Sequence, residues 1–254
     1  QNLDVEYLYE APLAMEREHL ASVVLECLHL PCPQPDLSDW ESMVNALRNA
    51  DKEVTIALVG KYISLHDAYL SVVEALKHGG IASHANVHIK WIDSEKVTEE
   101  NVEELLEDAD GLLVPGGFGS RGIEGKITAI HYARTHGLPF LGLCLGMQLA
   151  IVEYARNVVG YHDAHSIELN PNTMHPVIAL MPDQNGVEDI GGTLRLGAYP
   201  CKLKEGSLAR KLYGEELIYE RHRHRYEVNN DFRKALQDNG LSLSGISPDG
   251  HIVE

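Results

Sequence analysis

The 254-residue sequence lacks the features that mark several large classes of protein. No apolar run approaches the roughly 20 residues that a membrane-spanning helix needs, and no signal peptide opens the chain. Basic residues are scarce: 21 Lys and Arg stand against 38 Asp and Glu, which gives a formal net charge of -17 at pH 7. Such a chain offers no broad surface for neutralising nucleic-acid phosphates. We therefore expect neither a membrane nor a nucleic acid as partner, and we expect a cytoplasmic protein.

Cysteine is also rare, and its placement is uninformative except at one position. Cys27, Cys32, Cys144 and Cys201 show neither a disulfide framework nor the paired spacing of a zinc site. A reducing compartment keeps such thiols free. We therefore expect no bound metal and four reduced thiols.

The first 52 residues differ in character from the rest. Helical periodicity over 15–30 is broken by a proline-rich stretch at 31–35, and capping residues at 36–41 begin a second helix. From residue 53 onward strands alternate with helices. The expected strands are 54–59, 87–92, 111–114 and 140–143, and the expected helices are 67–77, closed by Gly79-Gly80, then 98–108, 123–136 and 145–155.

This alternation predicts an α/β fold with a parallel sheet and helices on both of its faces. The second half of the chain is less regular. Short strands at 176–181, 192–198, 216–219 and 241–245, with a helix at 207–213 and a loop at 182–191, predict a more antiparallel extension.

A candidate nucleophile lies at the end of the fourth expected strand. Cys144 stands in Gly142-Leu-Cys-Leu-Gly146, which follows an apolar run and precedes a helical one. This is the cysteine form of the Gly-x-Ser-x-Gly elbow, in which small neighbours let the backbone pack closely around a strained turn. A thiol at a helix N-terminus also feels the positive end of the helix dipole, which favours the thiolate. Taken alone, Cys144 is better explained as an inert buried cysteine, and the two flanking glycines with the second glycine motif reverse that preference.

A second glycine motif, Pro115-Gly-Gly-Phe-Gly119, follows the strand at 111–114. A phosphate-binding P-loop would need Lys-Ser or Lys-Thr after its last glycine, and neither is present. Adjacent parallel strands end at the same edge of a sheet. If the strands that lead to Pro115 and Cys144 are neighbours, the N–H groups of Gly117 and Leu145 lie beside the thiol and can hold an oxyanion.

Together the two glycine motifs resemble those of the class I (triad) glutamine amidotransferases. Further stretches at 59–62, 68–80, 191–197 and 221–229 narrow the resemblance to the CTP synthase family, and it runs through nearly the whole chain. The resemblance implies the flavodoxin-like, three-layer fold of class I glutamine amidotransferases, with a central, mostly parallel sheet and an antiparallel extension. It also implies three parts: 1–30, the tail of a synthetase (amidoligase) domain; 31–52, an interdomain linker; and 53–254, the amidotransferase domain without its C-terminal segment.

The activity that the resemblance implies is glutamine hydrolysis through a thioester. Cys144 attacks the side-chain amide, the N–H groups of Gly117 and Leu145 hold the oxyanion, and ammonia leaves. By matched position, Glu168 binds the α-ammonium of glutamine and Arg225 its α-carboxylate, which suits a substrate with one charge of each sign. The remaining pocket residues by matched position are Gly146, Met147 and Gln148.

The resemblance further implies partners and effectors outside this domain. It implies no cofactor here, but ATP and Mg2+ in a synthetase domain of the same polypeptide, where ammonia aminates UTP to CTP, and a homotetramer of the full-length enzyme. Leu3 to Val5 would border the ATP pocket. GTP is the implied allosteric activator, and Arg121 with the loop around 185–195 is its expected place of action. An ordinary surface arginine explains Arg121 equally well.

One part of the expected catalytic machinery does not occur in the sequence. The family's histidine base and acid stand as His-Pro-Glu after a strand near 251–254, and none of the 14 histidines here is followed two positions later by Glu or Asp. His222 and His224 match the arginine strand rather than the base. We therefore expect the sequence as given to be inactive or weak. Two alternatives stay open: a Cys-dependent amidotransferase or γ-glutamyl hydrolase with another partner, and a non-catalytic glutamine-binding or assembly module.

Overall fold

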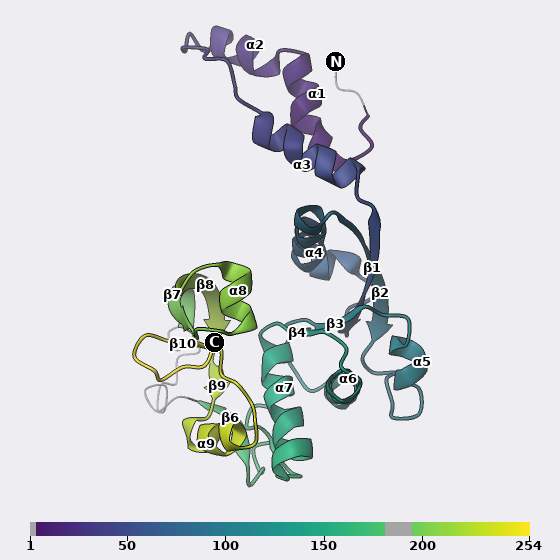
Figure 1. Ribbon diagram of the computed structural model, residues 1–254, viewed down its shortest axis with the longest axis vertical. Helices are drawn as coiled ribbons and strands as arrows, with labels where there is room; N and C mark the ends of the chain where they lie inside the picture. The colour runs from purple at the N-terminus through teal and green to yellow at the C-terminus, as the bar shows by residue number, and fades with distance from the viewer. Residues whose placement is uncertain (1–3, 181–194) are drawn as a thin grey trace. The chain divides into compact units, whose positions relative to one another are not determined.

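A computed structural model describes residues 4–180 and 195–254 (Figure 1). The chain separates into two compact units, one of residues 1–55 with 66–89 and the other of residues 56–65 with 90–254. The domain boundaries expected after residues 30 and 52 stay predictions. The loop expected at 182–191 and the residue Leu3 lie outside the described residues.

The first unit is mainly helical. Its helices are η1 (Leu8–Glu10), α1 (Ala11–Arg17), α2 (Leu20–Cys27), α3 (Ser38–Arg48), η2 (His66–Tyr69) and α4 (Leu70–Ser83). Strands β1 (Lys52–Gly60) and β2 (Ala85–Asp93) have residues in both units. The elements of the second unit are α5 (Val102–Leu106), β3 (Gly111–Val114), α6 (Ile123–His136), β4 (Phe140–Gly142), α7 (Leu145–Tyr154), the π-helix η3 (Ala155–Val159), β5 (His165–Ser166), β6 (Pro176–Leu180), β7 (Arg195–Leu203), α8 (Leu208–Tyr213), β8 (Leu217–His224), β9 (Tyr226–Val228), α9 (Asn230–Asp238) and β10 (Gly245–Ile246).

Two helix predictions in the first unit need correction. The periodic stretch over 15–30 is divided between α1 and α2, because His19 between them adopts a left-handed backbone conformation with φ 57. Helix α4 was expected to close at Gly79-Gly80, yet it continues to Ser83 and ends at the left-handed His84. Gly80 serves packing instead: a Cβ there would lie 2.6 Å from the carbonyl oxygen of Ala85.

The central sheet has the strand order β2-β1-β3-β4. Strand β3 pairs in parallel with β1 on one side and with β4 on the other. All four residues of β3 are buried, which explains their uninterrupted apolar run. Both β3 and α6 have the predicted bounds, and the predicted α/β fold with parallel strand pairs is confirmed.

The second half forms two further three-stranded sheets, with the orders β10-β7-β8 and β5-β6-β9. The β7–β8, β10–β7 and β6–β9 pairs are antiparallel, so the predicted antiparallel extension is confirmed. Local details differ. The strand expected at 241–245 is reduced to β10, the helix expected at 98–108 is the shorter α5, and β9 and α9 were not predicted.

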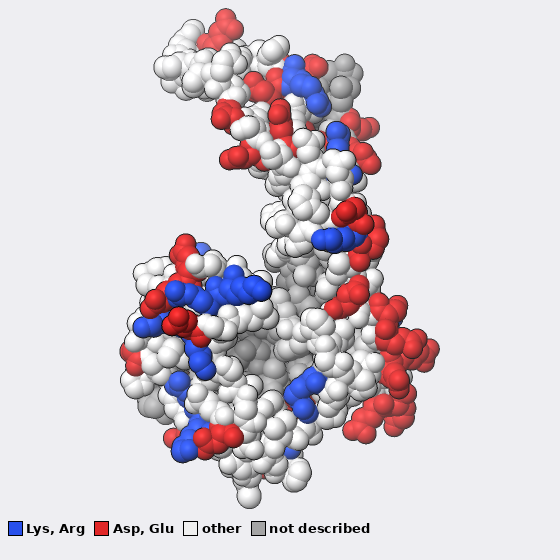
Figure 2. Space-filling view, in the orientation of Figure 1, with Lys and Arg blue, Asp and Glu red and all other residues white. Residues whose placement is uncertain are grey.

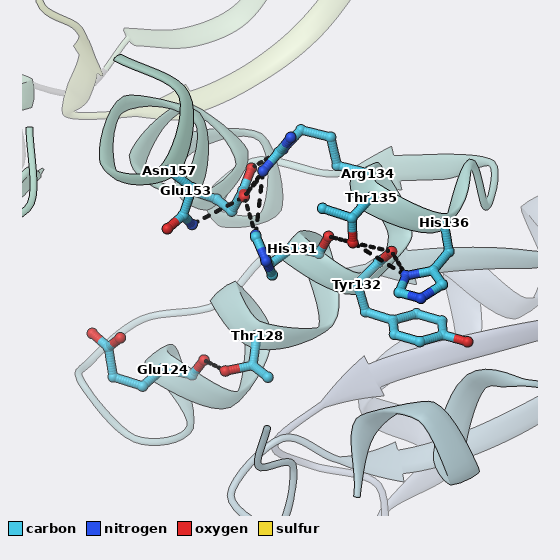
Figure 3. A network of polar contacts seen from close by, with 9 residues as sticks. All are labelled: Glu124, Thr128, His131, Tyr132, Arg134, Thr135, His136, Glu153 and Asn157. Carbon is cyan, nitrogen blue, oxygen red and sulfur yellow. Dashed lines mark hydrogen bonds and ion pairs between the residues drawn. The ribbon is translucent and has the colours of Figure 1, made fainter. Parts of the chain in front are cut away.

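A buried ion-pair network joins α6 to α7, the helices that follow β3 and β4 (Figure 3). Glu153 of α7 is 1% exposed and accepts hydrogen bonds from Arg134 of α6 through both of its oxygens, at 2.8–3.1 Å. His131 and Asn157 reach the same carboxylate at 2.8 and 3.0 Å. Burial alone would raise the pKa of Glu153, but these partners outweigh it and hold the pKa below its usual range. The network therefore fixes one helix against the other.

The surface reflects the acidic composition. Figure 2 shows Asp and Glu side chains gathered where Figure 1 places α5, whose first turn carries Glu103 and Glu104. Among the helices of the described residues, none is both long and apolar enough to cross a membrane.

Replacing Glu153 by Gln tests the network. The variant should lose roughly 1.5–3 kcal/mol of unfolding free energy at pH 7, because a buried, charge-assisted set of hydrogen bonds loses its anion. Urea unfolding measures this. Since the folded pKa lies below the unfolded one, the stabilisation is present above the unfolded pKa and is lost as the pH falls through the folded value. The wild type and the variant should therefore converge in acid.

The matched control is Lys234→Gln, which breaks an exposed pair with Asp238 on α9. That change should alter stability by no more than about 0.5 kcal/mol. Equal losses in the two variants would contradict the assignment of the Glu153 network as a stabilising contact.

Candidate active site

Cys144 occupies a strained turn between β4 and α7. Its backbone has φ 54 and ψ -106, a region that non-glycine residues rarely enter, and it is the N-cap of α7. The turn is held by hydrogen bonds from the Leu143 N–H to the Val114 carbonyl at 3.0 Å and from the Gly146 N–H to the Leu143 carbonyl at 2.9 Å. This is the geometry of a nucleophile elbow.

The two glycines around Cys144 are required by packing. A Cβ on Gly146 would lie 2.1 Å from the carbonyl oxygen of Val114, and a Cβ on Gly142 would lie 2.6 Å from the carbonyl carbon of Gly146. No side chain fits at either position, so the first turn of α7 can lie directly against β3 and β4.

The predicted adjacency of the two glycine motifs is confirmed. Strands β3 and β4 are neighbours, with Val114 opposite Gly142, so both motifs leave the same edge of the sheet. A Cβ on Gly116 would lie 3.3 Å from Cβ and 3.8 Å from Sγ of Cys144, and one on Gly117 would lie 3.8 Å from Cδ2 of Leu145. The loop therefore passes directly beside the thiol. The use of the Gly117 and Leu145 N–H groups as oxyanion donors stays a prediction.

The electrostatics of Cys144 correct the expectation that the N-terminus of α7 favours its thiolate. Burial raises the pKa of Cys144; the Leu145 N–H lowers it by hydrogen bonding, and the carboxylates of Glu227 and Glu168 raise it further. The net direction is upward, so the helix N-terminus does not suffice to hold a thiolate here. A protonated thiol needs a general base before it can attack.

Glu168 and Arg225 are close enough to act on each other. Burial raises the pKa of Glu168, and the charge of Arg225 partly opposes that rise. The Nε of Arg225 is buried and has no hydrogen-bond partner among the described residues, while its guanidinium lies 5.9 Å from the ring centroid of Tyr226. A buried donor without an acceptor is costly, so this nitrogen is suited to receiving an anion.

The other predicted pocket residues lie on the first turns of α7. Gln148 is 6% exposed and donates through Nε2 to the carbonyl oxygen of Tyr226 at 2.9 Å. That bond ties α7 to β9, immediately after Arg225. Leu145 and Gly146 are buried, and Met147 packs against the main core.

A buried charge cluster next to this site escaped the sequence analysis. Arg195 pairs with Glu227 at 3.0 Å and with Glu254 at 2.7 Å. Burial raises the pKa of Glu227 to about 7, against the opposing effect of Arg195. Glu227 follows Arg225 by two residues. Residues two apart in a strand point to the same face, and this spacing was the available signal that Glu227 lies near the site.

His222 and His224 also lie in this region. Nδ1 of His222 is 3.2 Å from Nδ1 of His224, and its Nε2 is 2.9 Å from the carboxylate of Glu254. Burial lowers the pKa of His224 to about 4, which keeps that ring neutral at physiological pH.

Arg121 has a surface position. Its Nε is 2.8 Å from the carboxylate of Glu95, its side chain is 56% exposed, and its guanidinium lies 5.7 Å from the ring centroid of Tyr62. The part of the 185–195 loop before Arg195 lies outside the described residues. Among the described residues, no group of three or more His, Cys, Asp and Glu side chains is arranged to hold a metal ion.

Comparison with known families agrees with this geometry. Residues 64–254 match the family model "Glutamine amidotransferase class-I". In structure, the chain is similar to the glutaminase domain of Trypanosoma brucei CTPS with bound acivicin, with a TM-score of 0.74, 37% sequence identity and 79% of each chain covered. The chain belongs to the class-I glutamine amidotransferases.

Within that family, its sequence and fold resemble those of CTP synthase glutaminase domains. The chain is 57% identical over 251 residues to the CTP synthase of Halalkalibacterium halodurans and 58% identical over 253 residues to that of Clostridium acetobutylicum. These matches cover 99% and 100% of this chain but 47% of each relative. The chain therefore spans about half the length of these curated relatives.

Gly146→Ala tests the elbow. A methyl group 2.1 Å from the Val114 carbonyl forces α7 away from β3, so we expect a loss of stability of at least about 2 kcal/mol and slower alkylation of Cys144. Urea unfolding and mass spectrometry of the alkylated protein measure the two effects.

Gly79→Ala is the matched control. This glycine lies inside α4, and a Cβ there meets nothing within 4 Å. The substitution should stabilise the protein by about 0.5–1 kcal/mol and leave Cys144 reactivity unchanged. A Gly146→Ala variant as stable and as reactive as the wild type would rule out the packing argument.

Proposed function

We propose that this chain is a glutaminase domain that hydrolyses glutamine through a Cys144 thioester and supplies ammonia for the amination of UTP to CTP. The observation that carries the proposal is the contact of the Gly116-Gly117 loop with Cys144 at a strained strand-to-helix turn. The family membership and the similarity to CTP synthases support the choice of reaction.

In the proposed reaction, Sγ of Cys144 forms a bond to the amide carbon of the glutamine side chain. The carbonyl electron pair moves to oxygen, where the Gly117 and Leu145 N–H groups hold it. The carbon–nitrogen bond then breaks, ammonia takes the proton that left the thiol, and water resolves the thioester to glutamate. Because burial raises the pKa of the thiol, a base must carry that proton. We assign this role to the histidine of a His-Pro-Glu segment, which residues 1–254 do not contain.

The substrate's amino-acid end is proposed to lie between Glu168 and Arg225. The unpartnered Nε of Arg225 gives the α-carboxylate a buried donor, and Glu168 gives the α-ammonium an acceptor. Gly146, Met147 and Gln148 would form the wall beside the side-chain amide, and Gln148 is already held in place by the Tyr226 carbonyl.

The second half-reaction is proposed to occur outside this chain. The curated relatives have about as much sequence again, which is room for a synthetase domain that binds ATP, Mg2+ and UTP. On this proposal 1–30 is the end of that domain, 31–52 is the linker, and the full-length enzyme is a cytoplasmic homotetramer. GTP activation would act through Arg121, whose guanidinium near Tyr62 presents a cation on an exposed surface.

Labelling tests the nucleophile. A glutamine analogue with a chloromethyl ketone in place of the amide should modify Cys144 selectively, because only that thiol lies beside an amino-acid pocket. Cys201 is buried and burial raises its pKa to about 11, so it should stay unmodified. Cys27 and Cys32 are exposed and should react with iodoacetamide but not selectively with the analogue. Peptide mapping distinguishes the four cysteines, and equal labelling of all four would contradict the assignment of Cys144 as the nucleophile.

Arg225→Ala tests the pocket. Losing a charge-assisted bond to the substrate carboxylate should weaken glutamine binding by roughly 1.5–3 kcal/mol, about 10- to 150-fold. The measurement is the KM for glutamine, or its Kd by calorimetry, in the full-length protein. Arg223→Ala is the control, since Arg223 is exposed two residues earlier on β8 and should have little effect. If both variants bind as the wild type does, Arg225 is not in the pocket.

A further inference from the structure

Lys126 is a buried lysine that the proposed reaction does not yet use. It lies in the first turn of α6, which begins after Gly122, and only 1% of its surface is exposed. It is among the largest fully buried side chains of the protein. Lysine is almost never fully buried without a partner, so its position requires an explanation.

The local electrostatics oppose a positive charge at this position. Burial lowers the pKa of Lys126 to about 8, and the nearby Lys61 ammonium lowers it too. The N-terminal turn of a helix is the positive end of its dipole, which also disfavours a cation. Within residues 4–180 and 195–254, no carboxylate forms an ion pair with Lys126, and Lys61 is the charged group that acts on its pKa. This cost is of the kind that proteins retain at functional sites.

The ammonium lies against the loop that passes Cys144. Nζ of Lys126 is 4.0 Å from the point that a Cβ of Gly117 would occupy, and Cε of Lys61 is 3.9 Å from the same point. Lys61 donates a hydrogen bond to the carbonyl oxygen of Phe118 in that loop. Two ammonium groups, one just after β1 and one on α6, therefore lie against the loop whose Gly117 N–H is proposed to hold the oxyanion.

We propose that Lys126 is a positioning residue of the oxyanion site, whose buried ammonium beside Gly117 adds positive potential where the tetrahedral intermediate places its negative charge. This inference rests on the proposed glutaminase function. Lys126 transfers no proton: it is protonated before sulfur bonds to carbon and remains so when the carbon–nitrogen bond breaks. Its field stabilises negative charge on the oxygen, which is larger in the tetrahedral intermediate than in bound glutamine, so it favours the transition state over the bound substrate.

The pH dependence follows from the same geometry. Lys126 stabilises the oxyanion fully while its ammonium is protonated, and this stabilisation disappears as the pH rises through about 8. Among the described residues, the charged group that acts on Lys126 is Lys61, which opposes its charge. The thiol of Cys144, whose pKa burial raises, also gains reactivity as the pH rises, so the two titrations must be separated by experiment.

The test compares Lys126→Met and Lys126→Arg with the wild type in the full-length protein. Two rates are measured against pH: kcat and KM for glutamine hydrolysis, and alkylation of Cys144 by iodoacetamide, which forms no oxyanion. Lys126→Met should lower kcat at least tenfold, leave KM within about twofold, and keep the limiting alkylation rate at high pH. Lys126→Arg should retain most of kcat and lose the decline near pH 8, because a guanidinium does not titrate there.

The melting temperature and a surface variant distinguish an electrostatic role of Lys126 from a structural one. Removing an unpaired buried cation should leave the melting temperature of Lys126→Met equal to or above that of the wild type, most clearly below pH 8. Lys211→Met, which removes an exposed charge on α8, should leave kcat unchanged. A wild-type kcat in Lys126→Met overturns the inference, and so does a parallel loss of alkylation and melting temperature, which would mark a structural role. If the wild type itself neither hydrolyses glutamine nor forms the thioester, the proposed function fails first.

Discussion

The approach of α7 to β3 is the contact on which the candidate site depends. Gly146 lies so near the Val114 carbonyl that even a methyl group is excluded, and Gly142 packs as tightly on Gly146. This contact brings the start of α7 to the edge of the sheet where the Pro115–Gly119 loop leaves β3. The backbone of Cys144 is strained in this arrangement, with a positive φ that few non-glycine residues adopt. The Glu153 network then holds the far turns of α7 against α6.

The electrostatic setting of the thiol explains why geometry alone does not make a catalyst. Cys144 is buried and faces two carboxylates, so its pKa rises although it starts a helix. A thiol in such a setting reacts slowly until a base takes its proton. The same low-dielectric surroundings strengthen every interaction with an oxyanion once it forms. On the role proposed for Lys126, the missing counter-ion that makes its ammonium unfavourable in the resting protein also leaves its charge unneutralised when an oxyanion forms.

Sequence reasoning worked best where one physical signal acted alone. The bounds of β3 and α6 were predicted because a fully buried parallel strand is a continuous apolar run and α6 ends at a left-handed glycine, Gly137. It failed where tertiary contacts overrode local preference. Gly79-Gly80 has the composition of a helix end, but α4 continues because Gly80 is needed where the helix meets Ala85. Strand β9 was not distinguished from the arginine strand that precedes it, and α9 begins after it at the capping residue Asn229.

The residues of the candidate site likewise divide into those that sequence patterns predicted and those that they did not. The elbow and its neighbouring loop were predictable because glycine spacing and parallel strand order together determine where two strand ends meet. Glu168 and Arg225 were proposed as pocket residues only through resemblance, since a single loop acid and a single strand arginine carry no local signal. Lys126 lay in an otherwise ordinary helix, and nothing in its sequence neighbourhood shows that its ammonium lies beside Gly117 rather than in water. A buried charge is recognised by what it lacks in three dimensions, namely a counter-ion and solvent, and neither absence is written in the order of residues.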